Sequence, residues 1–399
     1  MKIGWVRLSQ EIEFDYRTAT QPGIEERQGL MKELVRAGHR IICFSRIKKS
    51  HEPMLDDPPA GLSWLRRVSF DYEGFPREHK CKFLIIEMGP DNMMYEHKPT
   101  NEPYIRRMCR VIDGHKGVVF YYHADPLVPF PMDQIVGRKY KWGHKKNGYC
   151  NEKYKKGKWV AKSSWGTYDE IFRKKKFVIL HRADKLDTYL DVYGSGRTNY
   201  REYPIEFRHF PIGVDFAFRR HYRVVRHPKH DVVYAGSDRS RRNSFNRIYG
   251  QLAHMGMPIY LTGKWPEDYM AKYPTMKCTG WMPHFWQIDK YVNNSYCTIQ
   301  IQPDKACRMG WATLRPLEAI AEGVIALYDV ATKSSSLPLG ANYSIENAED
   351  AFRKIKHIRN MGYSERSKHN ALQRSKIRRL TFKNQAAALL SIFEEMCKS

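Results

Sequence analysis

Short apolar runs alternate with amphipathic stretches throughout the second half of the chain. Each run is rich in branched or aromatic residues and is bounded by glycine, proline or polar residues, which is typical of a buried strand. The strands are expected at residues 231–235, 258–262, 276–279, 297–301 and 324–328. The helices between and after them are expected at residues 244–254, 284–294, 313–322 and 346–360. Such alternation predicts a parallel sheet with helices on both faces.

The first half opens with the same pattern. Two apolar runs, residues 2–8 and 40–45, frame a helical stretch at 25–37 that ends at Gly38. Residues 46–80 are polar and contain several prolines, so we expect no regular element there. Further strands are expected at 82–88, 117–122 and 176–180, and further helices at 105–113 and, at the end of the chain, 382–397. The first half is therefore expected to be an α/β unit of its own.

Length and composition indicate two globular domains. A chain of 399 residues with 42% hydrophobic residues is large enough for about two cores. We predict α/β domains at 1–212 and 213–381, with the helix at 382–399 packing back on the first.

No apolar run reaches the roughly 20 residues of a membrane span, and the first ten residues lack the apolar core of a signal peptide. We therefore expect a cytoplasmic monomer that binds no membrane.

The eight cysteines favour the same compartment. None of them form a CxxC pair, and no histidine cluster lies beside them at the spacing of a zinc site. Cys43, Cys81 and Cys297 lie in apolar runs, so we expect buried thiols in a reducing cytoplasm. The sequence predicts no metal site.

The net charge narrows the choice of partner. The chain carries 68 Lys and Arg against 43 Asp and Glu, a formal net charge of +25. A field of this size attracts polyanions, while it adds nothing to the stability of the fold. Nucleic acid, an anionic membrane surface and nucleotide substrates are the candidate partners.

Residues 138–162 concentrate this charge. Ten of these residues are Lys or Arg, five large aromatic residues are spread among them, and we see neither a helical nor a strand period. Because cations neutralise phosphates and aromatic rings stack on bases, we predict that this segment contacts nucleic acid. The alternative is a basic insertion that folds its aromatic rings back onto the domain. The predicted DNA-binding residues are Arg138, Lys139, Lys141, Trp142, Lys145, Lys146, Lys153, Lys155, Lys156 and Lys158.

A second candidate site lies between the last two apolar runs. Thr313 can cap a helix there, and Pro316 then falls in its first turn, where the missing N–H costs nothing. Arg315 and Glu318 share one face of this helix near its start. A helix N-terminus at the carboxyl edge of a parallel sheet binds anions, so Arg315 can hold a diphosphate and Glu318 a ribose diol. In isolation the same pair would be an ordinary surface ion pair.

Three successive strands of the second half end in turns that contain glycine. Gly236 and Ser237 follow the first strand, Gly263 the second and Gly280 the third. Glycine lets the backbone approach phosphate groups closely, and two arginines that follow the first turn can add charge. Together with the pair on the fourth connection, these turns predict a cleft for a nucleoside diphosphate.

The motifs resemble those of the DNA β-glucosyltransferases of T-even phages, a family of two-domain GT-B glycosyltransferases. The resemblance is carried by VVYAGSDRS at 232–240, by the TGxxP turn at 279–283 and by DK followed by TLRxxE at 304–318. In the first half, DPLVPF at 125–130 follows an aromatic-rich strand, as the catalytic aspartate does in the family. The resemblance implies a GT-B fold, with two Rossmann-like domains and a cleft between them.

The resemblance also implies roles for individual residues. Asp125 would be the general base. The donor would be UDP-glucose, and Mg²⁺ or Mn²⁺ would be an optional aid to product release that no ligand cluster in the sequence demands. The implied donor-binding residues are Gly236, Ser237, Arg239, Arg242, Gly263, Met282, Arg315, Glu318 and Glu26.

Charge and resemblance together predict an inverting glycosyltransferase that moves glucose from UDP-glucose to 5-hydroxymethylcytosine in double-stranded DNA. The base must flip out to reach a cleft, and the modification would protect phage DNA from restriction in the host cytoplasm. The alternatives are another UDP-sugar or 5-hydroxymethyluracil, a glycosyltransferase for surface glycans, and a DNA-binding protein without activity. A surface-glycan enzyme would favour a basic amphipathic helix near the N-terminus, and a simple DNA-binding protein would leave the glycine turns without a use.

Overall fold

The computed structural model describes most of both halves of the chain. The described residues are 1–7, 11–14, 24–87, 102–122, 154–155, 158–159, 171, 174–188, 204–216, 222–236 and 241–398. Three predicted site residues, Asp125, Ser237 and Arg239, lie outside these ranges. So do the predicted DNA-binding residues Arg138, Lys139, Lys141, Trp142, Lys145, Lys146, Lys153 and Lys156.

The first half forms a seven-stranded sheet in the order β3-β2-β1-β4-β5-β8-β9, and every pair of neighbours is parallel. Ile3 of β1, for example, is paired with Ile41 on one side and Phe83 on the other. The strands are β1 (Lys2–Val6), β2 (Arg40–Cys43), β3 (Val68–Phe70), β4 (Phe83–Glu87), β5 (Val119–Tyr122), β8 (Phe177–His181) and β9 (Ile205–His209). The central strands are apolar on both faces because helices cover both.

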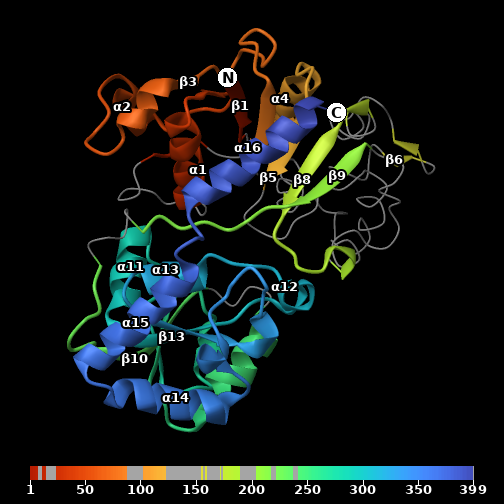
Figure 1. Cartoon of the computed structure of the whole chain (residues 1–399). Coiled ribbons are helices and arrows are strands. Elements are labelled where there is room, and N and C mark those ends of the chain that lie inside the picture. Colours follow the sequence, from red (N-terminus) through yellow and green to blue (C-terminus); the bar gives the residue numbers. More distant parts are fainter. Residues whose placement is uncertain are drawn as a thin grey trace.

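Helices from distant parts of the sequence cover this first sheet. Helix α1 (Ile24–Arg36) and helix α16 (Phe382–Lys398) lie on one face, and helix α4 (Glu102–Asp113) lies on the other. The ring of Phe393 in α16 stacks on Phe83 of β4 with centroids 4.1 Å apart. In Figure 1 the blue helix α16 accordingly lies across the red and orange elements of the first half.

The second half forms a six-stranded sheet in the order β12-β11-β10-β13-β14-β15, again parallel throughout. Its strands are β10 (His230–Ala235), β11 (Ile259–Thr262), β12 (Met276–Cys278), β13 (Ser295–Gln300), β14 (Ile325–Asp329) and β15 (Ser344–Ile345). Helices α11 (Phe285–Asn293), α13 (Arg315–Ala321) and α15 (Tyr363–Ile377) cover one face. The other face is covered by α14 (Ala348–Asn360) and the continuous helical stretch α8 (Arg242–Phe245), η6 (Asn246–Gly250) and α9 (Gln251–His254). Two parallel sheets, each with helices on both faces, confirm the predicted fold class.

Some elements differ from the sequence-based expectation. Residues 46–80 contain short regular elements, among them β3, although we expected none. Strand β9 was also not expected, because it is an edge strand whose residues are only partly buried and its apolar signal is weak. Within 138–162, where the sequence shows no strand period, β6 (Tyr154–Lys155) and β7 (Lys158–Trp159) form a short antiparallel pair. Helix α13 is capped by Leu314, and the predicted cap at Thr313 is also wrong.

Helix α15 was missed for an instructive reason. The side of α15 that faces the protein carries Arg366, Asn370 and Gln373, at helical spacing and buried, but polar. Arg366 donates to the carbonyls of Val225 and Arg226 at 3.0 and 2.7 Å. A search for apolar periodicity cannot find a helix whose buried face pairs with backbone groups.

Candidate functional site

The second sheet has its topological switch point between β10 and β13. These two strands are neighbours, and the chain continues from β10 to one side of the sheet and from β13 to the other. In such sheets the helices diverge at the switch point and leave a crevice at the carboxyl ends of the strands. The turn at Gly236 and the N-terminus of α13 lie at this edge, as the sequence predicted.

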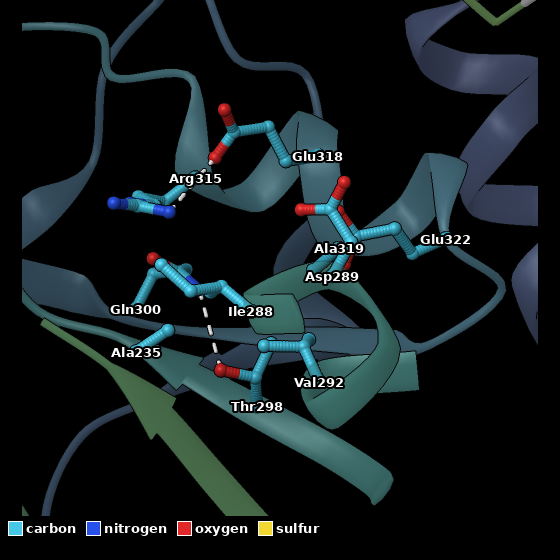
Figure 2. Close-up of a pocket in the computed structure, with 10 residues that line it drawn as sticks. All are labelled: Ala235, Ile288, Asp289, Val292, Thr298, Gln300, Arg315, Glu318, Ala319 and Glu322. Atoms are coloured by element: carbon cyan, nitrogen blue, oxygen red, sulfur yellow. Dashed lines mark hydrogen bonds and ion pairs between the residues drawn. The ribbon is translucent and has the colours of Figure 1, made fainter. Parts of the chain in front are cut away.

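Arg315 and Glu318 form an ion pair at the start of α13. The guanidinium Nη1 lies 3.3 Å from Glu318 Oε2, and the Arg315 side chain is 43% exposed (Figure 2). Partial burial works against the charge of Arg315, but the carboxylates of Glu318, Asp289 and Glu322 outweigh it and raise the pKa of the guanidinium. Arg315 is therefore a fixed cation at the switch point.

A small polar cavity lies beneath this pair. It has a volume of about 20 Å³, room for about one water molecule. Figure 2 shows Thr298 and Gln300 of β13 on one side, where Gln300 Nε2 donates to Thr298 Oγ1 at 3.3 Å, and Asp289 and Glu322 on the other. The cavity is too small for a nucleotide.

The three glycine turns are hydrogen-bonded to one another along the same sheet edge. The Gly236 N–H donates to the Thr262 carbonyl at 3.0 Å, and the Gly263 N–H donates to the Gly280 carbonyl at 2.9 Å. Trp265 Nε1 donates to the carbonyl of Gly236 at 2.9 Å. Gly263 and Gly280 have φ angles of 124° and 78°, which favour glycine and leave the backbone uncovered by a side chain. The structure thus brings the three predicted turns together.

An open hollow of about 490 Å³ adjoins two of these turns. Trp281, 60% exposed, forms part of its wall, and the ammonium of Lys264 lies 5.7 Å from the centre of its indole ring. Met282, the predicted uracil contact, is half-buried and follows Trp281 directly. The remaining lining residues are Gly263, Trp265, Pro266, Cys278 and Gly280.

Arg242 is the first residue of α8. Its side chain is exposed, and its guanidinium lies 5.3 Å from the centre of the Tyr269 ring. The predicted diphosphate contacts at Ser237 and Arg239 precede it in the turn, outside the described residues.

Glu26 lies at the carboxyl edge of the first sheet, in the first turn of α1. Its side chain is buried, and it pairs with Arg182, which follows β8. Arg182 Nη2 also donates to the hydroxyl of Tyr122, the last residue of β5, at 3.1 Å. Burial and the nearby Glu26 carboxylate raise the pKa of Tyr122 well above its usual value. Asp125, the predicted base, comes three residues after Tyr122.

A second buried cluster lies at the switch point of the first sheet. Glu87, at the end of β4, accepts from Arg27 at 2.6 and 2.9 Å, from Arg7 at 2.8 Å and from Trp5 Nε1 at 3.1 Å. Both arginine side chains are fully buried. Neither this cluster nor Arg182 was found from the sequence, because the partners lie 60 or more positions apart and follow no local pattern. The one sequence feature that could have indicated these residues is the presence of charged residues directly after apolar runs.

The remaining predictions concern metals and membranes. Among the residues that the structure describes, no group of three or more His, Cys, Asp or Glu side chains is placed to hold a metal ion. In the same part of the chain, no helix combines the length and the apolar character needed to cross a membrane. Of the predicted DNA-binding residues, Lys155 and Lys158 lie in the β6–β7 pair.

No family model matches the sequence, and neither does any curated protein. Solved structures, however, are similar to this chain along its whole length. The β-glucosyltransferase of phage T4 in complex with UDP-glucose has a TM-score of 0.64 at 15% identity, covering 99% of both chains. Trehalose-6-phosphate synthase OtsA has a TM-score of 0.56 at 9% identity, covering 99% of both chains. Sucrose-phosphate synthase from Thermosynechococcus elongatus has a TM-score of 0.54 at 10% identity, covering 100% of this chain and 99% of the other. The chain therefore has the two-domain α/β fold of GT-B glycosyltransferases, as the resemblance to the T-even phage enzymes implied.

Proposed function

We propose that this protein is an inverting glycosyltransferase that transfers glucose from UDP-glucose to 5-hydroxymethylcytosine in double-stranded DNA. The observation that carries the proposal is the arrangement at the switch point of the second sheet. Three hydrogen-bonded glycine turns and the Arg315–Glu318 pair lie along the carboxyl edge of that sheet, in a fold similar to that of a T4 enzyme solved with UDP-glucose. The resemblance of the sequence motifs, which is independent of the fold comparison, supports the same donor.

The donor would lie along the carboxyl edge of the second sheet. Its diphosphate would lie against Gly236 and Ser237 of the first glycine turn and would meet the cations Arg239, Arg242 and Arg315. Glu318 would accept from the ribose hydroxyls, and the backbone at Met282 would read the uracil. One neighbouring T4 structure contains UDP and Mn²⁺, so a divalent ion is proposed only as an aid to product release.

The acceptor would approach from the first half. The hydroxymethyl group of a paired base cannot reach a cleft between two domains, so the nucleotide would be flipped out of the duplex. Asp125 would take the proton of the hydroxyl group as its oxygen attacks the anomeric carbon, and Glu26 would lie toward the sugar. The oxygen–carbon bond to UDP breaks as the new bond forms, and the three arginines would stabilise the charge that develops on the diphosphate.

The main rivals share parts of this description. Another UDP-sugar, or 5-hydroxymethyluracil as the acceptor, would use the same fold and the same donor edge. A glycosyltransferase for surface glycans would keep the donor edge and use the positive charge to approach an anionic membrane, but the basic segment at 138–162 is interrupted by glycine and rich in aromatic residues, unlike a basic amphipathic helix. A DNA-binding protein without activity would explain the charge and leave the glycine turns and Arg315 unused.

One experiment separates these possibilities. The protein is incubated with duplex DNA that contains cytosine, 5-hydroxymethylcytosine or 5-hydroxymethyluracil, each with a panel of UDP-sugars, and the nucleosides are then weighed by mass spectrometry. The proposal expects a mass gain of one hexose on hydroxymethylcytosine with UDP-glucose. Gain on the other base, or with another sugar, would support the corresponding alternative, and no gain on any DNA would reject DNA as the acceptor.

A further inference from the structure

The end of strand β8 joins the two halves of the molecule. Residues 182–185, which we call the seam, are hydrogen-bonded through their backbone to the segment that precedes α13. The carbonyl of Arg182 accepts from the N–H of Ala312 at 3.4 Å, and the N–H groups of Asp184 and Lys185 donate to the carbonyl of Met309 at 3.1 and 3.2 Å.

The side chain of Asp184 fixes the seam to a second segment of that half. Its carboxylate accepts from the backbone N–H and the hydroxyl of Ser335, both at 2.6 Å, and from the hydroxyl of Ser334 at 3.3 Å. Ser334 and Ser335 follow β14, whereas Met309 and Ala312 follow β13. The seam is therefore hydrogen-bonded both to the segment that precedes α13 and to the segment that follows β14.

The contact is also apolar. Helix α12 (Asp304–Met309) and the residues after it belong to the hydrophobic core of the first half, where Ala306, Met309 and Trp311 are buried against its sheet. The segment that leads into α13 is thus packed on the first half, although α13 itself covers the second sheet. A shift of the first half would be transmitted to the start of α13.

The side chain of Arg182 links the seam to two elements of the first half. Its side chain is buried, pairs with Glu26 of α1 and donates to the hydroxyl of Tyr122 at 3.1 Å. A buried ion pair is costly to break, because the charge left behind has no water to solvate it. Arg182 thereby fixes the first turn of α1 and the end of β5 relative to each other, while its backbone carbonyl holds Ala312, three residues before Arg315.

We propose that Arg182 is a positioning residue of the transfer reaction, which sets the distance between the acceptor edge of the first sheet and the donor cation Arg315. The inference rests on the proposed function, since it assigns the first edge to the acceptor and the second to the donor. Reacting groups must be placed within a fraction of an ångström, and a misplacement of about 1 Å can cost on the order of 100-fold in rate. Arg182 itself would touch neither substrate.

The test compares Arg182→Gln with Arg182→Lys and with a matched control, Arg366→Gln. Arg366 of α15 is a similarly buried arginine that donates to the backbone carbonyls of Met361, Val225 and Arg226 and makes none of the seam contacts described above. Single-turnover transfer is measured with both substrates saturating, and UDP binding is measured by calorimetry. Arg182→Gln should slow transfer about 100-fold and leave the affinity for UDP within about twofold, and Arg182→Lys should recover part of the rate. Arg366→Gln should lower the melting temperature with little change in rate.

A second measurement needs no acceptor. Hydrogen exchange is followed in residues 310–316 and 119–122 with and without UDP. In the wild type, UDP should protect both segments, because the seam couples them, and in Arg182→Gln the protection should stay in 310–316. Asp184→Asn loosens the seam and leaves the Arg182–Glu26 pair in place, and it should uncouple the two segments in the same way. This variant replaces Arg182→Gln in the experiment if Arg182→Gln does not fold.

The outcomes distinguish this inference from the proposed function. If the wild type transfers no sugar to any DNA but UDP protects both segments, the proposed function fails and the coupling through Arg182 stands. If Arg182→Gln transfers sugar as fast as Arg366→Gln, or loses rate only in proportion to UDP affinity, Arg182 has no positioning role. The same conclusion follows if the coupling persists in both seam variants.

Discussion

At the scale of single residues, nucleotide binding at the proposed donor edge depends on which anionic group pairs with Arg315. In the free protein the guanidinium is paired with Glu318, and two further carboxylates, Asp289 and Glu322, lie close enough to raise its pKa. The proposed diphosphate would displace or share this pairing, and Glu318 would then accept hydrogen bonds from the ribose. The pair is therefore suited to exchange one partner for another when a nucleotide binds.

Replacing Glu318 by alanine should weaken UDP binding. The variant loses a charged hydrogen-bond acceptor for the ribose, which typically costs roughly 1.5–3 kcal/mol. Calorimetry with UDP measures the loss, and DNA affinity should stay the same. The control is Arg353→Ala, which breaks an ion pair of the same i, i+3 geometry with Asp350 on α14, far from the donor edge. Equal UDP affinity in the wild type and Glu318→Ala would remove Glu318 from the site.

Replacing Asp125 by asparagine should block chemistry and spare binding. Asparagine keeps the size of the side chain but cannot accept the proton, and loss of a general base typically slows a reaction about 10²–10⁴-fold. The measurement is single-turnover transfer at saturating UDP-glucose and hydroxymethylated DNA, with both affinities determined separately. A near wild-type rate would mean that Asp125 is only a turn residue before Pro126.

The buried imidazole of His115 should make stability depend on pH. Burial, with a smaller contribution from the nearby charge of Lys175, lowers the pKa of His115 from 6.5 to about 4. The unfolded chain takes up a proton near pH 6.5 and the folded one only near pH 4, so stability is full above 6.5 and falls as the pH is lowered toward 4. The slope is at most about 1.4 kcal/mol per pH unit for this group.

Urea unfolding at pH 7 and pH 5 tests this dependence. His115→Gln should lose less stability between the two pH values than the wild type does, whatever its stability at pH 7. The exposed His357 on α14 gives the control, and His357→Gln should keep the slope of the wild type. An unchanged slope in His115→Gln would assign the acid sensitivity to other groups, such as His181, whose pKa is also lowered to about 4.

Site residues could be predicted from the sequence where the chemical type of a residue and a local sequence pattern indicated the same position. The spacing of Arg315 and Glu318 and the glycine of each turn are local features, and the structure places them together at one edge. Arg182 and Glu26 are 156 positions apart, and Glu87 accepts hydrogen bonds from Trp5 and Arg7 at the end of β1 and from Arg27 of α1. Side chains that meet only through the fold leave no periodicity to detect, so both buried clusters were missed.

At the scale of elements, α15 shows how a polar face can pack. Gln373 is fully buried, and its side chain donates to the carbonyl of Ala326 at 2.7 Å and accepts from its N–H at 3.1 Å. Strand β15 pairs with β14 only at Tyr328 and Asp329, so Gln373 takes the place of a neighbouring strand beside Ala326. Asn370 and Arg374 donate to the last carbonyls of α13, those of Ile320 and Ala321, which supports the helix that carries Arg315.

Replacing Gln373 by leucine should destabilise the second half. Both backbone groups of Ala326 lose their side-chain partner in a buried place, at roughly 1–3 kcal/mol each. Thermal unfolding measures the loss, and hydrogen exchange should show a faster amide at Ala326. The neighbouring Leu372 is 46% exposed, so Leu372→Gln should change stability by no more than about 0.5 kcal/mol. If Gln373→Leu is as stable as the wild type, the side chain does not act as a substitute strand.

At the scale of the whole molecule, apolar alternation predicted two parallel sheets but not how they meet. Most strands of the two sheets were expected, because their apolar runs are long enough to be recognised individually, whereas β3, β9 and β15 were not expected. The insertion of α12 and Trp311 into the first core, and the seam at 182–185, depend on which surfaces are brought together after each half has formed. In the sequence, the residues that make these contacts are isolated and form no local pattern. The way in which the two halves pack against each other could therefore not be predicted.

The net charge of +25 raises the question of whether DNA is bound by a general field or by a defined segment. If residues 138–162 hold the duplex, changing Lys145, Lys146 and Lys156 to glutamine should leave three phosphates without a cation. The slope of log affinity against log salt should then shrink by about 2.7, at about 0.9 for each phosphate that is no longer neutralised, with UDP affinity unchanged. Fluorescence anisotropy over a range of salt concentrations measures this slope.

The control for this prediction removes the same charge from another surface. Lys356, Lys368 and Lys383 are exposed on α14, α15 and α16, and changing all three to glutamine alters the net charge by the same amount. A segment that binds phosphates directly should lose far more of the slope than this control, because exposed charges beyond about 10 Å are screened at ordinary ionic strength. Equal changes in the two triple variants would show that DNA responds to the whole field of the protein, and would favour the alternative that the basic insertion at 138–162 folds its aromatic rings back onto the domain.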